Sequence, residues 1–92
     1  MPSARFQRSS SIETSPVGDR VVLYDTVSRK AIVLNPTGAW LWNSLSTPRS
    51  ADELSQQLQA RFPTVEERRI QEDVAACLRQ LTEQEVVQQQ EA

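Results

Sequence analysis

The residues best suited to acid–base chemistry in this 92-residue chain gather in one stretch. Six charged side chains stand within eight positions: Glu66, Glu67, Arg68, Arg69, Glu72 and Asp73. Paired carboxylates can act as general acid and base when an apolar pocket shifts their pKa values. Here acids and bases alternate without such a pocket, which is typical of a solvated helix face with ion pairs at i, i+4. We therefore predict that the chain is not an enzyme and has no catalytic residue.

Cys77 is the only thiol of the chain, and the sequence contains no histidine. Without histidine, neither a His-based triad nor a Cys/His metal site can form, and a single cysteine excludes an internal disulfide. Cys77 follows the apolar spacing of its neighbours, so we interpret it as a small hydrophobic residue rather than a nucleophile. We expect no cofactor and no metal.

Two tryptophans are candidate recognition surfaces. Trp42 recurs in register with Ala39 and Leu45 at helical spacing, so core packing is the better interpretation. Trp40 lies off that stripe and either covers the edge of the core or forms a contact surface.

Composition and charge exclude several classes of partner. The formal net charge is −2 with no block of Lys or Arg, which disfavours a nucleic-acid partner. No apolar run approaches the roughly 18 residues that would cross a bilayer, and the N-terminus lacks the apolar region of a signal peptide. We expect a cytoplasmic protein without membrane contact.

The first third of the chain predicts strands. A weak strand near residues 8–14 precedes a turn at 16–19, which contains Pro and Gly. RVVLYD at 20–25 alternates between two faces, as a strand buried on one side requires. A loop at 26–29 separates it from KAIVL at 30–34, and the two runs predict a hairpin.

A helix follows this hairpin without a connecting loop. The side chain of Asn35 can cap free N–H groups of the first turn, and Pro36 occupies the first helical position, where a missing N–H costs nothing. Thr47–Arg49, with its proline, ends this helix.

Two further helices begin at capping boxes. Ser50–Glu53 predicts a short helix over about residues 51–60, and Thr64–Glu67 predicts a longer one over about residues 65–82. The longer helix has a clean apolar stripe. Its members are Ile70, Val74, Cys77, Leu78 and Leu81.

This order of elements predicts an α+β domain with winged helix-turn-helix architecture, a three-stranded antiparallel sheet followed by three helices. We expect residues 8–87 to form the domain, residues 1–7 a flexible N-terminus and residues 88–92 a flexible tail. The last strand is expected at the edge of the sheet, with unpaired backbone groups.

Three motifs together resemble one family. They are VVLYDTVSRKAIV, LNPTGAWLW and EDVAACLRQL followed by Val86 and Val87. Over most of residues 12–87 the chain resembles the PqqD-like proteins, the recognition domains for ribosomally synthesised and post-translationally modified peptides (RiPPs). It looks most similar to the stand-alone members that accompany lasso peptides.

The resemblance implies a function and a site. Family members bind the leader of a precursor peptide, which adds as a strand to the third strand and lies against the third helix, and they deliver it to a modifying enzyme such as a leader peptidase or cyclase. On this chain the strand template would be Ala31, Ile32, Val33 and Leu34. Asp73, Val74 and Cys77 match the helix motif, and helical geometry adds Ile70 and Ala76.

The chain departs from the family pattern at three positions. Arg29 and Glu85 stand where many members have glycine, in the hairpin turn and before the closing apolar pair. Cys77 stands where phenylalanine is frequent, which would enlarge the groove. Two other functions remain open: a small DNA-binding regulator of the same fold, which the acidic third helix disfavours, and a protein adaptor that uses the same strand edge.

Overall fold

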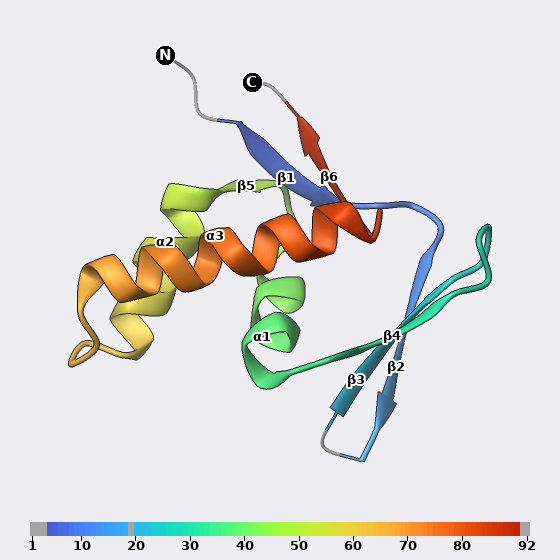
Figure 1. Ribbon diagram of the computed structural model, residues 1–92, viewed down its shortest axis with the longest axis horizontal. Coiled ribbons are helices and arrows are strands. Elements are labelled where there is room, and N and C mark those ends of the chain that lie inside the picture. The colour runs from blue at the N-terminus through green and yellow to red at the C-terminus, as the bar shows by residue number, and fades with distance from the viewer. Residues whose placement is uncertain (1–3, 19, 91–92) are drawn as a thin grey trace.

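The computed structural model describes residues 4–18 and 20–90, which form two antiparallel sheets and three helices (Figure 1). The strands are β1 (Arg5–Arg8), β2 (Ile12–Val17), β3 (Arg20–Asp25), β4 (Ala31–Leu34), β5 (Arg49–Ser50) and β6 (Val87–Gln90). The helices are α1 (Pro36–Ser44), α2 (Ala51–Arg61) and α3 (Glu67–Glu83). None of the helices in this part of the chain is both long and apolar enough to cross a membrane.

The first sheet has the order β2-β3-β4, with β3 at its centre. The predicted α+β class, with this sheet followed by three helices, is confirmed. Alternation along β3 is also confirmed, since Leu23 is buried and Tyr24 is exposed. Figure 1 shows the β3–β4 hairpin projecting away from the helices at its turn.

The second sheet, β5-β1-β6, was not predicted. The weak strand expected near residues 8–14 is in fact two strands, β1 and β2, that belong to different sheets. Between them the Ser9 N–H donates to the Val86 carbonyl and the Ser9 hydroxyl to the Glu85 carbonyl. β1 and β6 also occupy parts of the stretches 1–7 and 88–92 that were expected to be flexible, because each strand supplies the other with hydrogen-bond partners.

The predicted starts of α1 and α2 are confirmed. Asn35 Oδ1 accepts the Gly38 N–H at 2.7 Å, with Pro36 in the first turn. Ser50 and Glu53 form the complete capping box of α2. α1 ends at Ser44, before the predicted Thr47–Arg49 stop.

The capping box predicted for α3 at Thr64–Glu67 is wrong. The N-cap of this helix is Glu66, without a side-chain hydrogen bond. The Val65 N–H donates instead to the Phe62 carbonyl, and the Gln59 side-chain amide donates to the carbonyls of both residues. These bonds hold the chain in a turn through Val65, so the helix begins later than the sequence pattern indicated.

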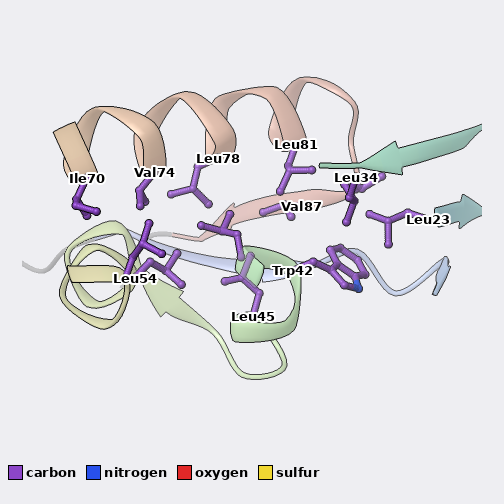
Figure 2. Close-up of a cluster of buried hydrophobic side chains, with 13 residues drawn as sticks. Leu23, Leu34, Trp42, Leu45, Leu54, Ile70, Val74, Leu78, Leu81 and Val87 are labelled. Carbon is purple, nitrogen blue, oxygen red and sulfur yellow. The ribbon is translucent and has the colours of Figure 1, made fainter. Parts of the chain in front are cut away.

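One hydrophobic core joins all three helices and both sheets (Figure 2). Trp42 belongs to this core at 1% exposure, as the sequence predicted, whereas Trp40 is only partly buried against it. The buried apolar residues are Leu23, Leu34, Leu41, Trp42, Leu45, Leu54, Leu58, Ile70, Val74, Leu78, Leu81, Val86 and Val87.

Arg8 and Thr14 tie the two sheets to α1 through Trp42. The Arg8 guanidinium donates to the Trp42 carbonyl and lies 4.5 Å from the centroid of its ring. The indole N–H donates to the Thr14 hydroxyl at 2.9 Å. Because these contacts come from β1 and β2, they fix the sheets relative to the helices and so position β4 beside α3.

Candidate functional site

The free edge of β4 carries backbone groups whose direction follows from the register of the hairpin. β3 and β4 pair so that Asp25 lies opposite Lys30 and Leu23 opposite Ile32, and the Asp25 N–H donates to the Lys30 carbonyl at 2.9 Å. In an antiparallel ladder, directly bonded pairs alternate with unbonded pairs. The backbone groups of Ile32 and Leu34 therefore point inward to β3.

Ala31 and Val33 accordingly direct their N–H and carbonyl groups outward, away from β3. Bonding on the other side of β3 agrees with this assignment. The Thr26 N–H donates to the Ser11 carbonyl, so even-numbered residues of β3 bond β2 and odd-numbered ones bond β4. A central strand must alternate in this way, and the outward groups of β4 are thus free to pair with an added strand.

The opposite edge of the same sheet is blunted. By the same register the backbones of Ile12, Thr14 and Pro16 point outward from β2. Proline has no N–H to donate, and it is tolerated in an edge strand when its nitrogen faces outward. Pro16 therefore interrupts the hydrogen-bonding surface of β2, whereas β4 has no proline.

Helix α3 forms the second wall of a groove beside β4. A cavity of about 100 Å³ between them is lined from the strand by Ile32, Val33 and Leu34, and from the helix by Cys77, Gln80, Leu81 and Gln84. A second cavity of about 300 Å³ continues past the end of the strand. It is lined by Asn35, Thr37, Asp73, Ala76, Cys77 and Gln80.

Most of the predicted site residues meet at this groove. Ala31 and Val33 supply its free backbone, Ile32 and Leu34 its apolar floor, and Asp73, Ala76 and Cys77 its helical wall. The resemblance implied one role for all four strand residues, but the pleat separates them into two pairs with different roles.

Ile70 and Val74 lie elsewhere. They are 3% and 0% exposed, and Figure 2 shows both side chains directed from α3 toward Leu54 of α2. Both belong to the apolar stripe that buries α3, and neither lines the two cavities beside β4. Val74 was predicted as a site residue because it matches the helix motif beside Asp73. The structure places its side chain in the core.

Thr37, Gln80 and Gln84 line the groove and were missed. Gln80 and Gln84 stand three and seven positions after Cys77, so they share its face of the helix. That spacing was a usable signal, but polar residues on an exposed helix face carry no pattern that distinguishes a groove wall from plain solvent exposure.

The groove offers no activated nucleophile. Burial raises the pKa of the Cys77 thiol, which keeps it protonated at neutral pH. Among residues 4–18 and 20–90, no group of three or more Cys, Asp or Glu side chains is placed to hold a metal ion. The groups that line the groove can form hydrogen bonds through backbone, amide and hydroxyl groups, an ion pair through Asp73, and apolar contacts.

Sequence comparison assigns the chain to a family. Residues 20–87 match the family described as coenzyme PQQ synthesis protein D (PqqD). The chain belongs to the PqqD family. This match spans β3, β4, all three helices and the first residue of β6, and thus both walls of the groove. No protein of curated function matches the chain.

A solved structure shares the PqqD fold seen here. It is described as TbiB1 in complex with the TbiA(beta) leader peptide, with a TM-score of 0.79 and 21% sequence identity. The similarity covers 89% of this chain and 94% of that one. It includes more of the chain than residues 20–87, so the fold extends beyond the region that defines the family by sequence.

Proposed function

We propose that this protein binds the leader segment of a RiPP precursor by β-strand addition to β4 and presents it to a peptide-modifying enzyme. The observation that carries the proposal is the free backbone of Ala31 and Val33 facing a groove whose other wall is α3. An extended peptide gains affinity from such main-chain bonds and specificity from alternate side chains. The protein itself is proposed to catalyse nothing.

Two similarities support this proposal. The chain belongs to the PqqD family, and the solved structure that shares its fold was determined with a leader peptide. We further propose that the system is of the lasso-peptide type, because the chain, over most of residues 12–87, looks most similar to those members. Since precursor peptides are made by ribosomes, we place the binding step in the cytoplasm.

The partner enzyme is proposed to be a leader peptidase or a cyclase. In strand addition, alternate side chains of the bound leader point to opposite faces of the sheet. One set points toward α3, and the other set points outward on the same face as the Val33 side chain. Val33 is 56% exposed on that outer face. An enzyme can therefore reach the leader from outside while the leader remains bound.

A direct test is calorimetric titration of the full chain with a synthetic leader of the precursor encoded beside it. We expect one-to-one binding at micromolar Kd or tighter, about −8 kcal/mol or better. A scrambled leader is the control. Absence of binding, together with a salt-sensitive gel shift of duplex DNA, would favour the regulator over the peptide-binding function.

A further inference from the structure

The two cavities beside β4 are built on the same helix surface, repeated one turn further along. α3 contributes Asp73, Ala76, Cys77 and Gln80 to the larger cavity, and Cys77, Gln80, Leu81 and Gln84 to the smaller one. Each residue of the second set stands four positions after a residue of the first. Four residues of helix rise about 6 Å.

An added strand repeats at nearly the same distance. Side chains two residues apart in a strand lie on one face and are separated by roughly 6.5–7 Å. Two side chains on the α3-facing side of an added strand therefore have nearly the same spacing as the two cavities. This geometry holds for either direction of the added strand.

The smaller cavity combines an apolar floor with polar lining from Asn35, Gln80 and Gln84. Leu34 and Leu81, 6% and 3% exposed, form its floor together with Ile32, and the pKa of the Cys77 thiol is raised by burial. A volume of about 100 Å³ accommodates a branched aliphatic side chain. Burial of such a side chain is worth about 1.5–3 kcal/mol, and an ionised group there would lose its hydration.

The larger cavity contains a charged residue, which the smaller one lacks. Its lining includes the Asp73 carboxylate, the Thr37 hydroxyl and the Gln80 amide, and neither Lys nor Arg. The Gly38 N–H already donates to Asn35 Oδ1. This bond uses the Asn35 oxygen as an acceptor and one N–H of the first turn of α1 as a donor. The acceptors that remain favour a ligand group that donates hydrogen bonds.

Asp73 is available to such a group. Its present partner is Arg69 at 3.7 Å, and both side chains are more than half exposed, at 54% and 73%. Exposed i, i+4 ion pairs contribute little stability, so a cation of the ligand can replace Arg69 at small cost. A carboxylate of the ligand would be repelled by Asp73.

We infer that the peptide bound at β4 carries a branched aliphatic residue and a basic residue two positions apart, the first seated between Leu34 and Leu81 and the second at Asp73. The inference rests on the proposed strand addition and defines the leader that this protein selects. Gln80 lies in both cavities and donates or accepts at the boundary between them.

The experiment selects ligands from a phage-displayed library of random 12-residue peptides on the full chain. Enriched peptides should share Val, Leu or Ile two positions from Lys or Arg. For a synthetic copy of an enriched peptide, Asp73→Asn should weaken binding about three- to fivefold, the upper part of the range for an exposed ion pair. Replacing the basic residue by norleucine should weaken binding to the parent protein but add little to the effect of Asp73→Asn.

Glu72→Gln is the matched control. Glu72 lies on the same helix in a similar exposed i, i+4 pair, with Arg68 at 3.2 Å, but does not line the groove. Its replacement should change affinity less than twofold.

Four outcomes overturn the inference. In two of them, the enriched peptides lack the apolar–basic pair or Asp73→Asn acts no differently from Glu72→Gln. If Val33→Pro still weakens binding at least about fivefold in these cases, strand addition stands. If instead no enriched peptide loses affinity on Val33→Pro, or none is enriched at all, the proposed function fails with the inference.

Discussion

The two edges of the β2-β3-β4 sheet differ although one central strand bonds both. β4 directs the backbone groups of Ala31 and Val33 into a groove that α3 closes on its far side. At the outer edge of β2, Pro16 interrupts the row of backbone N–H groups. An open edge invites pairing with any exposed strand, and proteins commonly block the edges they do not use. The difference agrees with the proposed docking of a peptide at β4 rather than at β2.

The strongest test of this comparison uses proline on β4 itself. Ile32→Pro removes an inward N–H that bonds β3, and we expect a loss of stability of roughly 2–3 kcal/mol or more. Val33→Pro removes an outward N–H, so this variant should fold like the parent and bind leader at least about fivefold more weakly, having lost one intermolecular bond. Circular dichroism and calorimetry separate the two effects. Parental binding by folded Val33→Pro would rule out strand addition at β4.

Cys77→Phe sharpens the comparison from the helix side of the groove. Cys77 is partly buried and lines both cavities. A phenyl ring at this position would fill the cavities in which we propose that leader side chains bind. We expect leader affinity to fall by more than about 1 kcal/mol with the fold retained. Ala75→Phe, at an exposed position of α3 outside the cavities, is the control. Unchanged binding with a lower melting temperature would assign Cys77 to the core alone.

Arg29→Gly tests the turn that presents β4. Arg29 has φ of 62° and Glu85 of 64°, the left-handed region that favours glycine, and these are the two positions where many family members have glycine. Arg29→Gly and Glu85→Gly should each raise the free energy of unfolding by about 0.5–1 kcal/mol. The reason is that the strain of a side chain at positive φ outweighs the conformational entropy that glycine loses on folding. Urea unfolding measures the change. A loss of stability would show that the side chains make contacts worth more than the strain.

Pro16→Thr tests whether the β2 edge is protected by its proline. The variant restores an outward N–H, and we expect a change in stability below about 1 kcal/mol, unchanged leader binding and increased self-association. Sedimentation velocity at several concentrations detects the association. A monomeric variant would show that Pro16 does not limit pairing at this edge.

The smallest expected effect is a pH dependence at the hairpin turn. Hydrogen bonds from the Val27 and Ser28 N–H groups and the Ser11 hydroxyl lower the pKa of Asp25. A carboxyl whose pKa is lower in the folded state stabilises the fold above its unfolded pKa of about 3.9, and this contribution disappears as pH falls through the folded value. Asp25→Asn should therefore flatten the acid limb of a stability profile recorded between about pH 5 and 2. Identical profiles would show that the turn does not depend on the charge.

Local features of this chain were predictable, and long-range pairings were not. The caps at Asn35 and Ser50 and the burial of Trp42 follow from spacings of a few residues, and the structure confirms them. The turn through Val65 was mistaken for a capping box, because the Gln59 side chain that holds it comes from the preceding helix. The pairing of β1 with β6 joins residues at opposite ends of the chain, and neither strand has an apolar alternation strong enough to reveal it.

The sequence by itself determined the β3–β4 hairpin, the three helices that follow it and the direct passage from β4 into α1 at Asn35, because hydrophobic period and capping chemistry act over one or two turns. The tertiary structure decided which groups of that strand are free. Hydrogen-bond parity depends on the register between β3 and β4, and a shift of one residue would exchange Ile32 for Val33 at the open edge. It also decided which face of α3 meets β4, where Gln80 and Gln84 line the groove while Ile70 and Val74 pack into the core. Packing of the whole domain sets that rotation, since the apolar stripe of the helix must be buried against α2 and the core.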